Sequence, residues 1–206
     1  MAKTKKQIRG RVGNTVFYQV GNETRIRSTA FQYTDANTEE QQANRSRFRV
    51  AIRFYQRLAE TFLRETWKIA AADSGKSGYN LFMKMNMTAF KPDGKIGDFS
   101  LLQLAEGVLQ KVNHLSAVAD SEDTVTLTWE NDANISPARA TDRLIVVVLH
   151  ENRSFSPTVI EEIPAIREDE RATFRLNRQQ GTTAHLYCFF KAKDGNAYSP
   201  SQYLRI

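Results

Sequence analysis

The side chains best suited to chemistry in this sequence are arginines at regular spacing. Two of them alternate along a segment typical of a β-strand, and three others recur at every fourth residue of a segment typical of a helix. These five residues are Arg25, Arg27, Arg45, Arg49 and Arg53. Like charges on one helix face repel one another by about 0.2–0.5 kcal/mol per pair unless an anion neutralises them. The pattern therefore predicts a candidate polyanion-binding surface.

The charge balance suggests what such a polyanion could be. Residues 1–97 carry 18 Lys and Arg against 8 Asp and Glu, a net charge of +10, whereas residues 98–206 carry 11 against 15. A basic half of this kind fits nucleic acid that is bound without sequence specificity through its phosphates. The alternative is that the arginines lie on solvated faces, where charged residues are most often found. The sequence leaves both interpretations open.

Residues for enzyme chemistry are sparse. None of the three histidines, His114, His150 and His185, is spaced to bind a metal together with another histidine or a cysteine pair. The stretch "AAADSGKS" at Ala70–Ser77 has the letters of a relaxed phosphate-binding loop, but it follows a predicted helix rather than a buried strand. We therefore expect no enzymatic activity, no catalytic or metal-binding residues, no cofactor and no small-molecule substrate.

The first element that positions the arginines is a predicted β-hairpin. Val16, Tyr18 and Val20 alternate with polar or aromatic neighbours, and a "GN" turn begins at Gly21. The following segment, Thr24–Ser28, alternates in the same way and carries the first two arginines on one face.

A long helix is predicted from Thr38 to Ala72. Thr38 and Gln41 have the spacing of a capping box, and neither Gly nor Pro interrupts the pattern, so the helix would span roughly 50 Å. Gly75 is expected to end it, and a shorter helix would then run from Ser77 or Gly78 to Phe90. We expect the two helices to pack as an antiparallel hairpin.

An apolar stripe along the long helix favours an assembly function. Its aromatic members include Phe48, Tyr55 and Phe62, and only the short helix and the hairpin are expected to cover them. Uncovered apolar surface of this kind is typical of self-association. We therefore predict a non-enzymatic structural, assembly or protein-interaction protein, with a non-specific nucleic-acid-binding protein as the alternative.

From Val112 onward, short alternating segments separated by turn residues predict an all-β sandwich. "TVTLTWE" with Trp129, and "AKDGNAYSPS" with Gly195 and Pro200, resemble the fibronectin type III pattern. The resemblance covers the last 95 residues or so and implies an immunoglobulin-like sandwich without indicating a function. The predicted core residues are Val125, Leu127, Trp129, Leu186, Cys188 and Phe190.

The whole chain also resembles a family of uncharacterised Bacteroides proteins. The shared features are a "G-x-x-G-N-x-V-F-Y" start at Gly10–Tyr18, an "I-R-S" strand at Ile26–Ser28, and a helix start with Thr38, Gln41 and Arg45. The resemblance implies the same order of domains and no mechanism.

These observations together predict an α+β protein of two domains. Residues 1–97 would form a basic domain of a β-hairpin and a long two-helix hairpin, and residues 110–206 would form the sandwich. The sequence contains no run of about 18 apolar residues, so it predicts no membrane span. The N-terminus lacks the apolar segment of an export signal. With a single cysteine, we expect a cytoplasmic protein without disulfides.

Overall fold

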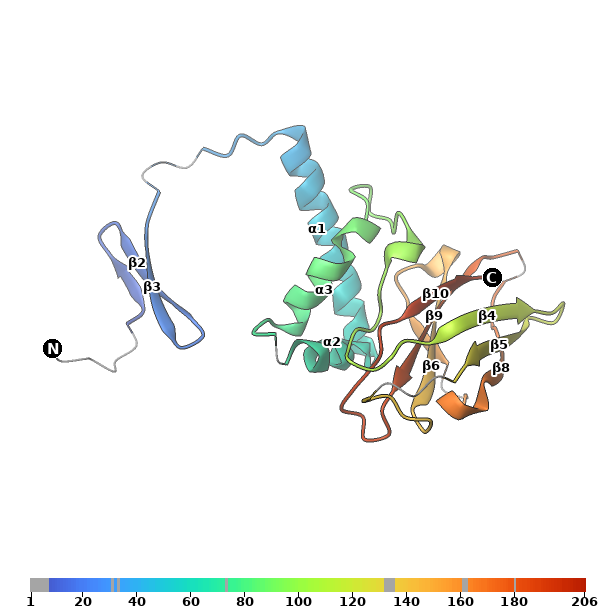
Figure 1. Cartoon of the computed structure of the whole chain (residues 1–206). Coiled ribbons are helices and arrows are strands. Elements are labelled where there is room, and N and C mark those ends of the chain that lie inside the picture. The colour runs from blue at the N-terminus through green and yellow to red at the C-terminus, as the bar shows by residue number, and fades with distance from the viewer. Residues whose placement is uncertain are drawn as a thin grey trace. The chain divides into compact units, whose positions relative to one another are not determined.

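A computed structural model describes residues 8–30, 32, 34–72, 74–131, 136–160, 163–179 and 181–206 (Figure 1). The chain combines helices with antiparallel sheets, which confirms the predicted α+β class. It divides into two compact units, Met1–Glu39 and Glu40–Ile206. We call them the N-terminal unit and the main unit.

The N-terminal unit contains an antiparallel sheet in the order β1-β2-β3. Its strands are β1 (Gly10–Val12), β2 (Thr15–Val20) and β3 (Glu23–Ser28). Two-residue turns join them, and Gly13 and Gly21 each have the positive φ that such tight hairpins require. The predicted hairpin is therefore confirmed as β2 and β3, and β1 extends it.

The main unit begins with two helices where the sequence predicts one. Helix α1 (Glu39–Arg57) is followed by a 3₁₀ turn at Leu58–Glu60 and by α2 (Leu63–Ala71). The chain turns at Thr61, whose backbone is extended. The Thr61 hydroxyl donates to the Leu58 carbonyl (3.0 Å) and accepts from the Leu63 N–H (3.2 Å). These bonds satisfy the backbone at the break without Gly or Pro, so the prediction of one continuous helix was wrong.

The third helix packs directly on the second. Helix α3 (Gly78–Asn86) continues into a 3₁₀ turn at Met87–Ala89, and the Ser77 hydroxyl caps its start by accepting from the Asn80 N–H. A Cβ atom on Gly78 would lie 2.8 Å from the Trp67 carbonyl carbon. Glycine is therefore required where α3 begins against the backbone of α2.

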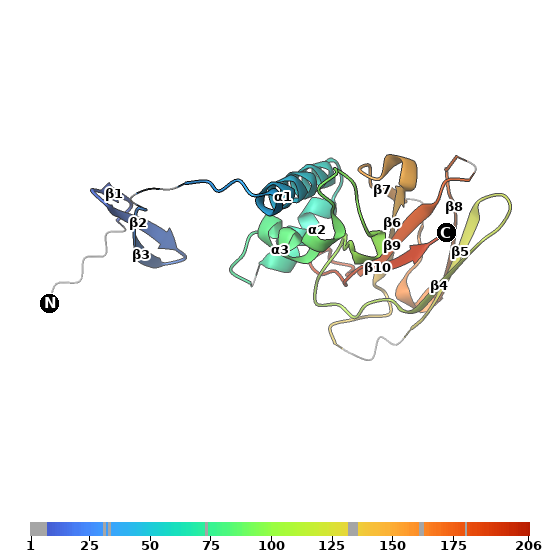
Figure 2. The same cartoon turned by 90° about the horizontal axis from the view of Figure 1, so that it is seen from above.

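The remaining strands form two antiparallel sheets. One has the order β4-β5-β8 and the other the order β10-β9-β6-β7 (Figure 2). The strands are β4 (Asn113–Ala119), β5 (Thr124–Glu130), β6 (Arg143–His150), β7 (Thr158–Ile160), β8 (Arg171–Arg175), β9 (Ala184–Lys191) and β10 (Gln202–Arg205). Short 3₁₀ turns lie at Phe99–Leu101, Glu151–Arg153 and Arg167–Asp169.

The two sheets share one hydrophobic core. All of the core residues predicted from alternation are buried, which confirms that prediction; they are Val125, Leu127, Trp129, Leu186, Cys188 and Phe190. These side chains occupy alternate positions of β5 and β9, as expected for strands that turn one face toward a partner sheet.

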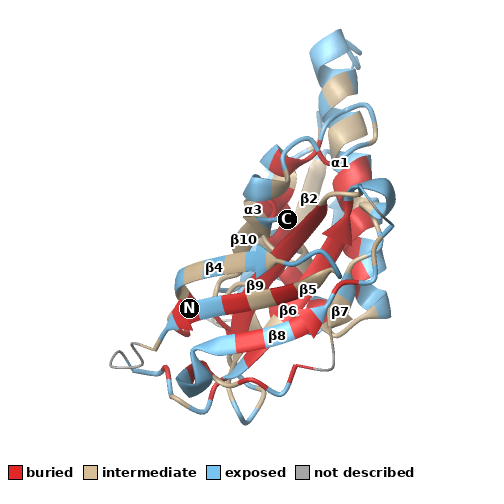
Figure 3. Ribbon diagram, turned by 90° about the vertical axis from the view of Figure 1, so that its right-hand side faces the viewer, coloured by how far each residue is buried: buried red, intermediate tan, exposed pale blue. Residues whose placement is uncertain are grey.

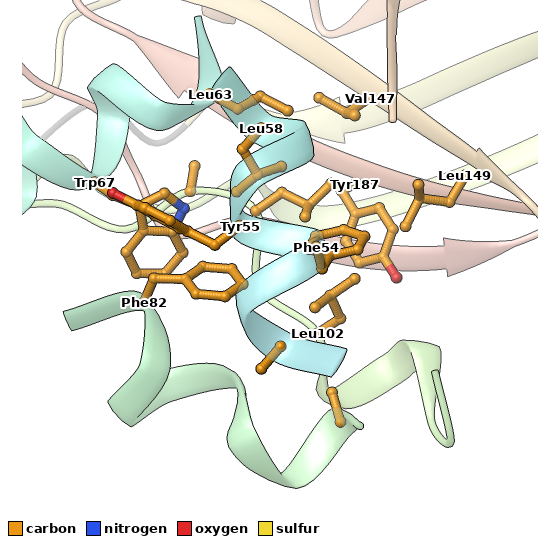
Figure 4. Packing of buried hydrophobic residues seen from close by; sticks show 14 of the residues in the cluster. Phe54, Tyr55, Leu58, Leu63, Trp67, Phe82, Leu102, Val147, Leu149 and Tyr187 are labelled. Atoms are coloured by element: carbon orange, nitrogen blue, oxygen red, sulfur yellow. The ribbon is translucent and has the colours of Figure 1, made fainter. Parts of the chain in front are cut away.

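A second core lies on the opposite face of the four-stranded sheet. Val147, Leu149 and Tyr187 of that sheet share this core with helical residues that include Phe54 and Trp67 (Figure 4). Strands β6 and β9 are therefore buried on both faces over most of their length (Figure 3). This double burial explains the unbroken apolar run of β6, because a strand covered on both sides needs no polar alternation.

The division of the chain differs from the predicted boundary between residues 97 and 110. The helices share a core with the sheet, and the connecting segment is buried at Leu102, Leu104 and Leu109. The Leu104 N–H donates to the Ser201 hydroxyl, and the Ser201 N–H donates to the Ala105 carbonyl, both at 3.0 Å. The charge reversal near residue 97 thus falls inside one packed unit. Among the described residues, no helix is long and apolar enough to cross a membrane.

Candidate functional site

One face of the N-terminal sheet carries no charged side chain. Opposed residues of antiparallel strands share a face, and the register opposes Phe17 to Ile26 and Val12 to Thr15. The remaining residues of this uncharged face are Gly10, Gln19, Thr24 and Ser28. Its aliphatic side chains are open to solvent, because 70% of Val12 and 63% of Ile26 are exposed.

The other face of the same sheet is basic. On this face Val16 of β2 lies opposite Arg11 of β1 on one side and Arg27 of β3 on the other. Tyr18 of β2 lies opposite Arg25 of β3. Arg25 also pairs with Glu23 on this face, with a nitrogen to oxygen distance of 3.3 Å. An exposed pair of this kind contributes about 0–1 kcal/mol. The basic face therefore suits water or an anion.

This sheet has no interior of its own. Every described residue of its strands is exposed or half-buried. A two-stranded hairpin alone is at best marginally stable in water, and a sheet of three strands needs a hydrophobic face, or a helix packed against it, to be stable. The uncharged face is the part of the sheet that such packing would cover.

The predicted helical arginines lie on α1 of the main unit, whereas Arg25 and Arg27 lie on the N-terminal unit. Arg45, Arg49 and Arg53 are all exposed. Their side chains follow one helix face, as the four-residue spacing predicts. The five predicted arginines thus form two separate sets on two different units.

The predicted self-association residues do not form one exposed surface. Phe48 is 43% exposed, but Tyr55 is buried in the helical core with ring centroids 5.4 Å from Tyr79 and 5.0 Å from Phe82. Phe62 is half-buried and stacks on Tyr198. The apolar stripe was expected to lack cover, but Tyr55 packs against α3 and Phe62 against Tyr198, so that of these three residues Phe48 alone is exposed.

The buried titratable groups belong to the packing of the main unit. Burial raises the pKa of the Cys188 thiol to about 12, so this cysteine is a core residue rather than a nucleophile. His185 stacks on Phe99, and its Nδ1 shares a 2.9 Å hydrogen bond with the Tyr203 hydroxyl. Burial lowers the pKa of His185 and favours the neutral ring. Within the described residues, no group of three or more His, Cys, Asp or Glu is arranged to hold a metal ion.

A buried arginine, which sequence reasoning missed, joins the two sheets. The Arg167 guanidinium lies 3.5 Å from the Asp142 carboxylate and donates to the Gln110 carbonyl at 2.8 Å. The Trp129 indole N–H donates to the Arg167 carbonyl, also at 2.8 Å. These contacts tie three separate segments together, so we assign Arg167 a structural role.

The segment that resembles a phosphate-binding loop has the context expected from the sequence. It leaves α2 and reaches Ser77, the N-cap of α3, so no strand precedes it. A phosphate-binding loop instead connects a buried strand to a helix. This context gives no support to nucleotide binding.

Comparison with known proteins places the chain in a family without assigning a function. No curated protein matches it. A family model described as a family of unknown function, DUF6266, matches residues 5–205, which include most of the N-terminal unit and nearly all of the main unit. Because the match extends over almost the entire chain, the protein belongs to the DUF6266 family.

Proposed function

We propose that this protein is a non-enzymatic assembly protein whose copies associate through the uncharged face of the N-terminal sheet. The observation that carries the proposal is the exposure of Val12 and Ile26 on a sheet without an interior. Covering these side chains and Phe17 with a second apolar surface would remove them from water, at about 25 cal/mol for each Å² of apolar area.

A second copy of the chain is the partner that this face fits best. Two uncharged faces can meet without removing any charge from water, which is the costly part of burying polar surface. The identical face on another copy is such a surface, and a two-fold arrangement closes on itself. The basic face, by contrast, would repel its own copy through Arg11, Arg25 and Arg27.

The main unit would then lie outside the interface between copies and stay accessible in the assembly. Its strands β4 to β10 support a fibronectin type III-like assignment, since they form two antiparallel sheets with Trp129 buried on the second strand. Sandwiches of this kind serve varied roles, so the assignment indicates architecture and leaves the partner of the main unit open.

The test is sedimentation equilibrium of the full chain over a dilution series. Ile26→Lys places a charge on the uncharged face and should shift the protein toward monomer. Val20→Lys is the matched control, because Val20 is an exposed valine of the basic face. A wild-type protein that stays monomeric at all concentrations would sink the proposal, and so would equal loss of association in both variants.

Non-specific nucleic-acid binding is a second candidate, favoured by one arrangement on the basic face. Tyr18 is 38% exposed and lies opposite Arg25, with Arg27 two residues further along β3. An aromatic ring beside a guanidinium group suits a stacked base with its flanking phosphate. Binding to random-sequence DNA should then weaken steeply with salt, and Arg25→Gln with Arg27→Gln should reduce the log–log slope by about 2. Salt-independent binding, or none, would exclude this candidate.

A further inference from the structure

Strand β3 is a free edge of the N-terminal sheet, because it pairs with β2 alone. All six of its residues are exposed. A two-residue turn that begins at Gly21 separates Val20 from Glu23, so these two residues form a hydrogen-bonded pair across the hairpin. Every second residue of β3, beginning with Glu23, therefore directs its backbone N–H and C=O toward β2. The Thr29 N–H follows the same order, since it donates to the Asn14 carbonyl at 2.7 Å.

The residues between these direct their backbone groups away from the sheet. They are Thr24, Ile26 and Ser28, and their N–H and C=O groups form no hydrogen bond with any described residue. An edge strand with unpaired backbone groups is a template for one further strand. Strand β3 is the longer of the two edges of this sheet, since β1 has three residues.

The side chains along this edge are charged on one face and uncharged on the other. Arg25 and Arg27 lie on the basic face, and Ile26 lies between them on the uncharged face. Glu23 pairs with Arg25, whereas Arg27 forms no ion pair with any described residue. Residues 1–39 hold seven Lys and Arg against three Asp and Glu, so the whole N-terminal unit has an excess of positive charge. This edge therefore attracts acidic side chains.

A second copy of β3 is a poor match for this edge. The two antiparallel registers that align most of β3 place Arg25 opposite an arginine of the other copy, either Arg25 or Arg27. Like charges directly opposite each other destabilise a strand pair. Each copy brings two arginines and one glutamate, so the paired strands would keep a net positive charge. The arginines thus disfavour edge pairing between copies and favour an acidic partner.

From this edge we propose that β3 binds an extended segment of another protein, in which acidic residues alternate with apolar ones. The backbone of the added strand hydrogen-bonds to Thr24, Ile26 and Ser28, which supplies affinity. Its acidic side chains lie beside Arg25 and Arg27, and its apolar side chains lie beside Ile26. The site uses the edge of the sheet rather than its uncharged face, so it is independent of the proposed association between copies.

The test uses short peptides and titration calorimetry with the full chain. In the first peptide glutamate alternates with valine, in the second lysine replaces glutamate, and the third has the residues of the first arranged as one block of each type. We expect the first peptide to bind about tenfold more tightly than the third, because only alternation places all the carboxylates on one face of a strand. The lysine peptide should not bind. Equal affinity of the two glutamate peptides, or no binding of the first, would overturn the proposal.

A proline variant tests whether the backbone of β3 makes the contact. Thr24→Pro removes one outward N–H, and an edge strand tolerates proline where the N–H faces away from the sheet. Thr24→Ala is the matched control, since it also loses the hydroxyl that accepts from the Gln19 amide but keeps the N–H. Binding of the first peptide should weaken about tenfold in Thr24→Pro and little in Thr24→Ala. Equal binding to both variants would contradict strand addition.

Amide hydrogen exchange of the wild-type chain decides the question even where the proline variant does not fold. The first peptide should slow exchange at Thr24, Ile26 and Ser28. It should leave Arg11 unchanged, because Arg11 is the outward-directed residue of the opposite edge strand. Slow exchange at the three β3 residues without peptide, increasing with protein concentration, would show that a second copy occupies the edge. That result, or unchanged exchange with peptide, would overturn the proposal.

Discussion

The guanidinium group of Arg167 lies 3.8 Å from the centroid of the Phe190 ring, and both side chains are fully buried. Phe190 belongs to the core between the two sheets. The positive charge of Arg167 therefore lies at the edge of an apolar core. The nearby Asp142 carboxylate balances that charge at 3.5 Å. Arg167 is thus stabilised by a ring face, a carboxylate and a backbone carbonyl together.

Removing one member of this buried pair should be costly. Asp142→Ala leaves the Arg167 charge without its partner carboxylate, and we expect it to lower the free energy of unfolding by about 3–5 kcal/mol. Arg167→Met combined with Asp142→Ala should be less destabilising than the sum of the two single changes, because no unpaired charge remains. Urea denaturation of the four proteins measures both effects. Additive losses would show that the pair is not energetically coupled.

Limited proteolysis should separate the two compact units. The described residues between β3 and α1 are mostly exposed and have no regular secondary structure, so a protease of broad specificity should cut first between residues 29 and 38. Mass spectrometry should then find a stable fragment that begins near residue 40. First cleavage between Lys91 and Asn113 would instead support the boundary that the charge reversal predicts.

Stability should fall in mild acid because two histidines are buried. Burial lowers the pKa values of His150 and His185 below the ordinary value of 6.5. As the pH falls through 6.5, the unfolded chain binds protons that the folded chain does not, so the free energy of unfolding decreases. The decrease should level off below the folded-state pKa values.

A variant can assign part of this acid sensitivity. His185→Phe keeps a ring stacked on Phe99 and removes the titrating group, so denaturation midpoints should depend less steeply on pH between about 7 and 5. His114→Phe is the control at an exposed position. An unchanged pH dependence in His185→Phe would contradict the assignment.

The parts of the fold that follow from local pattern could be predicted. Alternation around Gly21 identified β2 and β3, and alternation in "TVTLTWE" and in the strand of Leu186 identified the core between the sheets. Ser77 could be recognised as a helix cap because its side chain accepts a hydrogen bond from a backbone N–H only three residues further along the chain.

The features that escaped prediction depend on contacts distant in the sequence. Arg167 is buried because Asp142, 25 residues away, and the Gln110 carbonyl both reach it, and a lone arginine in the sequence predicts exposure. The apolar run of β6 did carry a signal of double burial, which would have shown that the helices pack against the sheet. The uncharged face of the N-terminal sheet depends on the pairing of β1 with β2, and β1 is only three residues long.

Oxidative cross-linking of variants that each carry one introduced cysteine beside the native Cys188 is the most direct test of association through the uncharged face. Cys188 is buried with a raised pKa, so a cysteine introduced in place of Ile26 would be the reactive thiol of the folded chain. If two copies meet through this face, Ile26→Cys should form a covalent dimer rapidly under mild oxidation, whereas Val20→Cys on the basic face should form little. Slow cross-linking of Ile26→Cys at concentrations where the chain is associated, or faster cross-linking of Val20→Cys, would contradict the proposed interface.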